Sequence, residues 1–265
     1  AGFDPVLQEG IETKDGNVTL MGGFGETVDY DHLLAEKVDF VVSAHTFEHI
    51  VDPRMTLERL KPHLAERFDF VIEVPSSVSM VDQVRMDQVF PQHVNYYSPA
   101  SMAALMKPLG LHLVKSEHNF RYWGGTQLLF FSNYRSASEP PVGVKLASVM
   151  ESIGLFAHAI DIAQKQLRHG EYHSRYAFGA AQMLPILAYH MGYDYFCETI
   201  SAIIDDNLAR QGLFFPALDV PIVGSTDTTV ADSQIVITAL DSSKALVQRA
   251  IDMRAMSIVS PVGIL

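Results

Sequence analysis

The chain has 265 residues, of which 48% are hydrophobic and 19% charged, a composition typical of proteins with a folded core. Intrinsic disorder is excluded as the main state, because so much apolar surface can offset the entropy lost on folding. The formal net charge of -12 disfavours nucleic acid as a partner, since a polyanion would be repelled. Continuous apolar runs fall far short of the roughly 20 residues that a bilayer requires, so no membrane partner is expected.

Cysteine content and the N-terminal residues bear on the compartment. Cys197 is the single cysteine, so neither a disulfide nor a CxxC zinc site can form within this chain. Near residue 1 there is no basic stretch followed by an apolar run, which a secretory signal would require. We therefore expect a cytoplasmic protein that acts on a small molecule.

The first 133 residues alternate between predicted strands and helices. Strands are expected at residues 1–5, where one ends, and at 18–21, 38–43, 68–74, 111–116 and 126–131, with helices at 52–64 and 98–110. The run VDFVVS at 38–43 is almost continuously apolar, which predicts a strand buried on both faces. Gly124-Gly125 indicates a hairpin. This pattern predicts an α/β sheet that ends in two antiparallel strands.

The second half repeats the α/β pattern after a connection. Residues 134–143 form a polar, proline-containing linker, and a helix is expected at 144–169. A strand-to-helix turn at 176–181, strands at 199–206, 234–240 and 256–259, and helices at 182–190 and 242–253 follow. We expect three parts: a domain at 1–133, a linker and helical connection at 134–170, and a second domain at 171–265.

Ligands of open parallel sheets bind at the carboxyl ends of the strands. That rule selects Asp4, the glycine-rich residues 22–26, residues 44–49 and residues 73–76 in the first domain. An acidic residue such as Asp4 can accept hydrogen bonds from a ribose diol, although an Asp-Pro pair also suits a solvated turn. The glycines at 22–25 allow the backbone to approach a flat ligand, and such loops are also common as simple turns.

Residues 45–49 spell H-x-x-E-H, the inverted zincin signature. A zinc hydrolase would need His45 and His49 one helical turn apart, a third distant ligand, and Glu48 as base. The motif directly follows a predicted strand, so a metalloenzyme is kept as a minor alternative.

His93 is the general-base candidate, because it is the one side chain in the polar and aromatic segment 89–98 that titrates near neutral pH. The alternative is a structural histidine that hydrogen-bonds at the approach to a helix.

The residues then reveal a resemblance. Residues 38–64 read VDFVVSAHTFEHIVDPRMTLERLKPHL and resemble the region after the third expected strand of class I S-adenosylmethionine-dependent methyltransferases. The segments VIEVPS, QHVNYYSPASMAALMKPLGL and WGGTQLLFFS look like those of the sugar C-methyltransferases, in the same order. YAFGAAQMLPILAYHMG and AIIDDNLARQGLFFPALDVPIVG resemble that family's C-terminal Rossmann-like domain. The resemblance implies a Rossmann-like methyltransferase sheet with antiparallel terminal strands, plus a second, smaller Rossmann-like α/β domain.

The resemblance also implies roles for individual residues, carried over by position. Asp4 would bind the cofactor ribose, while Gly23, Phe24, Ala44 and His45 would border the adenine and methionine parts of S-adenosylmethionine. His93 would be the base and His49 would lie near the reacting sugar, with Gln92 positioning or polarising oxygens. The substrate-binding residues would be Tyr96, Tyr97 and Glu73.

The sequence departs from the family pattern at several places. The zinc-binding cysteine cluster and the glycine-rich loop after the first strand are expected upstream of residue 1. The family's HEH segment is Pro91-Gln92-His93 here, and Trp123 stands where a histidine is common. A neutral amide at Gln92 cannot act as a carboxylate base.

The resulting hypothesis is a metal-independent C-methyltransferase acting on a nucleotide-linked keto-deoxysugar, in which His93 removes a proton next to the keto group. The alternatives are an O- or N-methyltransferase acting on another glycan or metabolite, and a non-catalytic binding or assembly subunit of the same fold.

Overall fold

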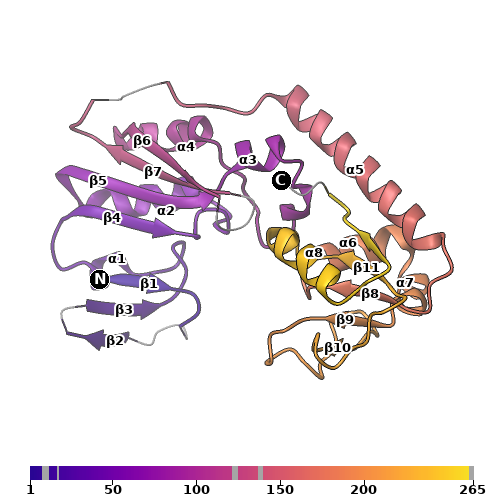
Figure 1. The fold of residues 1–265 in the computed structure, drawn as a ribbon. Helices are drawn as coiled ribbons and strands as arrows, with labels where there is room; N and C mark the ends of the chain where they lie inside the picture. Colours follow the sequence, from indigo (N-terminus) through magenta and orange to yellow (C-terminus); the bar gives the residue numbers. More distant parts are fainter. Residues whose placement is uncertain (8–11, 17, 121–124, 137–139, 263–265) are drawn as a thin grey trace. The chain divides into compact units, whose positions relative to one another are not determined.

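The computed structural model describes residues 1–7, 12–16, 18–120, 125–136 and 140–262. The chain divides into two compact units (Figure 1). The first contains residues Ala1–Met80 and Val89–Lys145, and the second contains Val81–Gln88 and Leu146–Leu265.

The first unit contains a small three-stranded sheet. Its strands are β1 (Gly2–Asp4), β2 (Glu12–Asp15) and β3 (Val18–Gly22), in the order β1-β3-β2. β1 and β3 run parallel, with Asp4 opposite Gly22, while β2 pairs antiparallel with β3. Asp4 and Gly22 therefore lie at the same carboxyl edge. β2 was not predicted, because its sequence ETKD has no apolar alternation and forms a strand only through its pairing with β3.

A four-stranded sheet carries the remaining strands of this unit. It contains β4 (Val38–Ala44), β5 (Leu64–Pro75), β6 (His112–Asn119) and β7 (Thr126–Ser132), in the order β4-β5-β7-β6. β4 and β5 are parallel, whereas β7 pairs antiparallel with both β5 and β6. The predicted antiparallel terminal strands are confirmed. Trp123 and Gly124 of the WGGT segment and of the predicted hairpin turn lie outside the described residues.

Two expectations for this unit are corrected. The predicted single sheet is divided into the three- and four-stranded sheets, since β1 and β4 are not paired with each other. β4 is not buried on both faces either: Phe40 is 57% exposed and Val42 is 62% exposed. Both side chains lie on the same face of the strand and line a cavity, so packing does not cover that face.

Local signals set the helix ends of the first unit. Its short helices are α1 (Tyr30–Leu33), α2 (Pro53–Leu60) and α4 (Pro99–Met106), with 3-10 turns at Lys61–His63 and Lys107–Leu109. At α2, the Asp52 carboxylate accepts from the Met55 amide at 2.9 Å. Ser98 and Ser101 form a reciprocal capping box at α4. These helices and the central strands enclose a core that includes Phe70, Ile72, Val74, Met102, Met106, Leu129 and Phe131.

The second unit is built on a five-stranded sheet. Its strands are β8 (Arg175–Phe178), β9 (Ala202–Ile204), β10 (Ile222–Val223), β11 (Gln234–Ile237) and β12 (Ser257–Val259), in the order β10-β9-β8-β11-β12. All four strand pairings are parallel. The helices are α5 (Leu146–Arg168), α6 (Met183–Met191), α7 (Tyr193–Thr199) and α8 (Ser243–Asp252), with a 3-10 turn at Leu240–Ser242. The predicted smaller Rossmann-like unit is confirmed.

Boundaries in the second unit differ from those expected. The strand predicted at 199–206 covers only Ala202–Ile204, because Thr199 ends α7. The helix α5 belongs to this unit, and so does the segment Val81–Gln88, which includes the end of α3 (Ser77–Asp82) and the 3-10 turn Met86–Gln88.

A buried ion-pair cluster attaches this segment to the second unit. The Arg85 guanidinium donates to both oxygens of Asp87, each at 2.8 Å, and to Asp241 at 2.7 Å. Arg85 and Asp87 are both buried. The segment is thus held by charged contacts as well as by packing.

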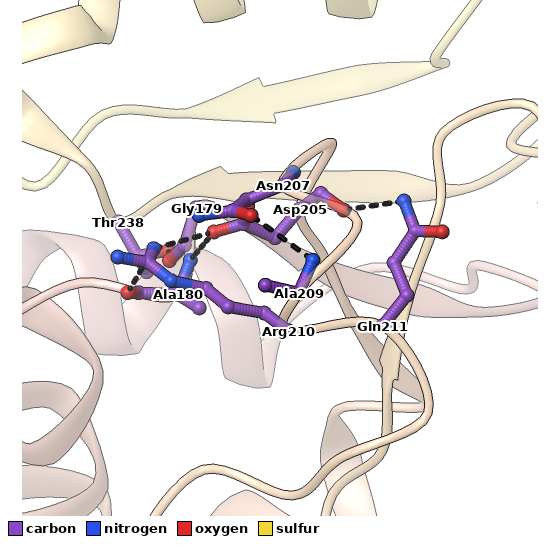
Figure 2. A network of polar contacts seen from close by, with 8 residues as sticks. All are labelled: Gly179, Ala180, Asp205, Asn207, Ala209, Arg210, Gln211 and Thr238. Carbon is purple, nitrogen blue, oxygen red and sulfur yellow. Dashed lines mark hydrogen bonds and ion pairs between the residues drawn. The ribbon is translucent and has the colours of Figure 1, made fainter.

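A second polar network closes the carboxyl edge of β8 and β9 (Figure 2). One oxygen of Asp205 accepts from the Ala180 amide at 2.9 Å and from Arg210 at 3.0 Å, and the other accepts from the Asn207 amide at 2.9 Å. Gly179 has φ 105°, and a Cβ there would lie 2.4 Å from the Ala239 Cβ. The turn after β8 therefore requires glycine.

The helix α5 is long and apolar enough, by length and composition, to cross a membrane. Its residues Ser152, Phe156, Ile160, Ala163 and Leu167 are buried along one face. A core helix with a buried stripe passes the same test, so this single helix is weak evidence for a membrane span.

Candidate active site

A cavity of about 260 Å³ lies in the first unit, between the unpaired edges of β1 and β4. Its lining residues include Gly2, Phe3, Asp4, Phe40, Val42 and Ala44. β1 and β4 run in the same direction, so their carboxyl ends lie on the same side (Figure 1). Two predicted cofactor-binding residues, Asp4 and Ala44, thus line one cavity with apolar walls and a carboxylate at its rim.

Asp4 also forms the turn that an Asp-Pro pair favours. Its carboxylate accepts from the Val6 amide at 2.8 Å, and its carbonyl accepts from the Gly23 amide at 3.3 Å. Gly23 is thereby brought to the Asp4 end of β1, while Phe24 is 56% exposed. The structure combines both interpretations of Asp4, because this exposed turn residue also lines the cavity.

A buried glutamate follows β4. Glu48 is 1% exposed, and its Oε1 lies 3.3 Å from His45 Nδ1 and 4.0 Å from His49 Nε2. The Glu48 carbonyl accepts from the amides of Val94 and Asn95, at 2.9 and 3.1 Å. Glu48 therefore anchors the loop that carries His93 and also presents a carboxylate to the neighbouring histidines.

The two predicted catalytic histidines come together from segments that are far apart in sequence. The rings of His49 and His93 are 4.9 Å apart, and the His93 ring lies 4.1 Å from that of Phe90 and 6.2 Å from that of Tyr96. His93 is buried, whereas the His49 side chain is 45% exposed. His49 therefore lies between the buried imidazole and solvent.

The pKa values of His93 and His45 are shifted in opposite directions. Burial lowers the pKa of His93, and the nearby charge of Glu48 only partly offsets this effect. The hydrogen bond with Glu48 raises the pKa of His45, against the effect of burial. A neutral imidazole has a nitrogen lone pair, and a general base requires one.

The predicted substrate-binding residues occupy different environments. The Tyr96 hydroxyl accepts from the Phe90 amide at 3.2 Å, which holds its ring near His93. Tyr97 belongs to the core, where its hydroxyl donates to the Phe47 carbonyl at 3.4 Å and burial raises its pKa to about 12. Glu73 accepts from the Thr126 hydroxyl at 3.1 Å, and its Oε1 lies 3.8 Å from His45 Nε2.

Gln92 contributes its backbone to the cluster. Its carbonyl lies 2.7 Å from His49 Nδ1, and the residue is exposed. The side chain that replaces the family's glutamate is therefore not what holds His49 in place.

The zincin arrangement is not formed by the H-x-x-E-H residues. Glu48 and His49 lie in a turn, and His45 has φ 50°, so this segment is not helical. His45 and His49 consequently do not present the helical i, i+4 spacing that the zinc-hydrolase alternative requires.

The sequence interpretation missed two contributors. Glu48 entered it only as the base of a metalloenzyme, and Phe90 had no assigned role. Glu48 contacts residues about 45 positions away, and Phe90 contacts His93 within an irregular loop. Hydrophobic periodicity does not predict either kind of contact. The signal available in the sequence for Glu48 was its position between His45 and His49, directly after a predicted strand.

Comparisons with known proteins support a methyltransferase assignment for the first part of the chain. Residues 1–116 match the family described as a methyltransferase domain. The C-methyltransferase NovU of Streptomyces niveus is 30% identical over 134 residues, which are 49% of this chain and 31% of that protein. The chain thus spans about a third of the curated relative that it matches.

Two solved structures are also similar. A complex of the Haloferax volcanii Trm112 methyltransferase activator with a methyltransferase matches with 15% identity and a TM-score of 0.36, over 48% of this chain and 66% of that chain. A protein assigned as an O-methyltransferase from Nostoc punctiforme matches with 16% identity and a TM-score of 0.31, over 43% and 35%. Such low TM-scores carry no weight on their own.

The assignment therefore rests on the family match and on the strands described above. Asp4, Gly23 and the segment with His45 and His49 lie at or directly after the carboxyl ends of β1, β3 and β4, whereas Gln92 and His93 come from an irregular loop. Residues 1–116 match the methyltransferase-domain family, and the chain is similar to a C-methyltransferase over 134 residues.

Proposed function

We propose that the protein is an S-adenosylmethionine-dependent C-methyltransferase that acts on a nucleotide-linked keto-deoxysugar, with His93 as the general base. The observation that carries the proposal is the convergence of His49 and His93, with ring centroids 4.9 Å apart, on a buried carboxylate in a methyltransferase domain. The substrate class comes from the resemblance of the sequence motifs to sugar C-methyltransferases.

The residues around the cavity fit the cofactor chemically. Asp4 presents a carboxylate at the end of β1, where a ribose diol can donate to it, and the walls at Phe40 and Val42 offer apolar surface to an adenine ring. When bound, S-adenosylmethionine supplies an electrophilic methyl group.

His93 would remove the proton from the substrate carbon next to the keto group, and the pair of electrons left behind forms an enediolate. The neutral imidazole accepts that proton and becomes an imidazolium. Glu48 carries the opposite charge nearby, so the imidazolium forms beside a fixed carboxylate. His49, half-exposed at the mouth of the cluster, would lie near the reacting sugar.

Two measurements separate base catalysis from cofactor binding. Proton–deuterium exchange next to the keto group, followed by NMR on a panel of nucleotide-linked keto-deoxysugars, reports the base alone. His93→Ala should abolish this exchange and methyl transfer while leaving the affinity for S-adenosylhomocysteine within a few-fold. Persistent exchange in His93→Ala would refute the role of this histidine.

Asp4→Ala should show the opposite pattern, because it removes a cofactor contact. Calorimetric titration with S-adenosylhomocysteine should show weaker binding, and exchange should be retained. The matched control is Asp31→Ala, whose side chain is 97% exposed and does not line the cavity. A product whose new methyl carbon is bonded to oxygen or nitrogen, as reported by its 13C chemical shift, would favour O- or N-methylation. Absence of cofactor binding would favour a binding subunit.

A further inference from the structure

The buried carboxylate of Glu48 lacks the hydrogen bonds that such a group normally has. Oε1 has the 3.3 Å contact with His45 Nδ1, whereas Oε2 has no hydrogen-bond partner among the described residues, although Glu48 is 1% exposed. Its ion-pair contacts among the described residues, to His45 and His49, both go to Oε1. Oε2 is therefore left without a cation, and a buried carboxylate is costly in that state.

His49 points an unprotonated nitrogen at this carboxylate. A backbone carbonyl can only accept, so the 2.7 Å contact with the Gln92 carbonyl requires the proton of neutral His49 to be on Nδ1. Nε2 then carries a lone pair and lies 4.0 Å from Glu48 Oε1, which is too long for a hydrogen bond. Histidines that bind metals usually donate their other ring N–H to a carbonyl or carboxylate in this way.

His93 completes a set of three ligands. One ligand atom from each of Glu48, His49 and His93 lies within 4.8 Å of the others. Zinc binds nitrogen and oxygen at about 2.0–2.2 Å in tetrahedral geometry, so two of its ligands lie about 3.4 Å apart. Side-chain shifts of less than about 1 Å would therefore bring all three atoms onto one ion.

We propose that Glu48, His49 and His93 form a binding site for a divalent transition-metal ion such as Zn²⁺. Two imidazoles and one carboxylate are a ligand set that zinc accepts, and the half-exposed His49 provides access from solvent. The set differs from the zincin motif, because His93 replaces His45 and Glu48 is a ligand instead of a base. A coordinated His93 has no lone pair for a substrate proton, so bound metal should inhibit methyl transfer; this consequence rests on the proposed function.

Metal binding can be tested without activity. Co²⁺ added to the purified protein should produce the visible absorption of a low-coordinate nitrogen and oxygen site, and Zn²⁺ should displace it with one-to-one stoichiometry. Glu48→Gln and His49→Ala should each weaken Zn²⁺ binding at least about tenfold, since even residues that only support a ligand contribute 10–100-fold. The control is His112→Ala, an exposed histidine on β6.

Unchanged Zn²⁺ affinity in Glu48→Gln and His49→Ala would overturn the site, provided that circular dichroism shows both variants folded. Equal weakening in His112→Ala would overturn it too, because binding would then be a general surface effect. If Zn²⁺ occupies the site but methyl transfer continues at full occupancy, the metal site stands and His93 is not the base. The failure of the site and the failure of the proposed function are thus distinguishable.

Discussion

The ion-pair cluster at Arg85 allows a stability prediction with a magnitude. Arg85→Ala removes three hydrogen bonds, two to Asp87 and one to Asp241, and leaves the Asp87 carboxylate buried without its cation. Removal of one partner from a buried pair costs about 3–5 kcal/mol. The exposed pair of Lys165 with Asp161 on α5 is the comparison, and Lys165→Ala should cost about 0.3–0.5 kcal/mol.

Hydrogen exchange of the β11 amides, followed by mass spectrometry, would measure the opening free energy of the second unit. We expect Arg85→Ala to lower that free energy several-fold more than Lys165→Ala does. The double variant Arg85→Ala, Asp87→Ala should recover part of the loss, because it removes the carboxylate that was left unpaired. An Arg85→Ala cost no larger than that of Lys165→Ala, or no recovery in the double variant, would refute the reasoning.

Three further predictions concern stability. Gly179→Ala should lower the thermal midpoint, because Gly179 has φ 105° and a Cβ there would lie 2.4 Å from the Ala239 Cβ. The control Gly154→Ala on α5, where a Cβ would meet nothing within 4 Å, should be neutral or stabilising by up to about 1 kcal/mol. Equal midpoints in the two variants would contradict this prediction. Ser98→Ala removes the cap of α4 and should cost about 1 kcal/mol in urea unfolding, and no loss would mean that the capping box adds nothing. Burial acts to raise the pKa of Asp205, but the hydrogen bonds of Figure 2 outweigh it and lower this pKa. The stability that Asp205 contributes should therefore be fully present above its unfolded-state pKa of about 4 and should be lost as the pH falls through its lower folded-state pKa. The stability gap between wild type and Asp205→Asn should shrink over that interval in urea titrations, and a constant gap would refute the assignment.

Much of the fold could be predicted where the signals act over a few residues. Asp52 and Ser98 mark the starts of α2 and α4. Gly110, with φ 75°, ends the 3-10 turn that follows α4. These contacts form within one helical turn, so they depend little on the rest of the chain. The apolar strands β5 and β7 were similarly evident, although β5 extends further than expected.

Other elements were decided by partners that are distant in sequence. β2 is a polar segment that forms a strand through its ladder with β3, and Val81–Gln88 joins the second unit through Arg85 and Asp241. The burial of β4 was mispredicted because an apolar run does not reveal whether other segments cover both faces of a strand.

The same distinction between local signals and distant contacts applies to the candidate active site. The sequence alone determined that His49 and His93 are chemically suited to proton transfer, since residue type sets the available protonation states. Only the tertiary structure decided that their rings lie 4.9 Å apart, that Tyr97 belongs to the core, and that Glu48 is buried beside them. The physical reason is that burial and proximity arise from packing among segments that are far apart along the chain, and packing sets both the charge balance of the cluster and its possible ligands.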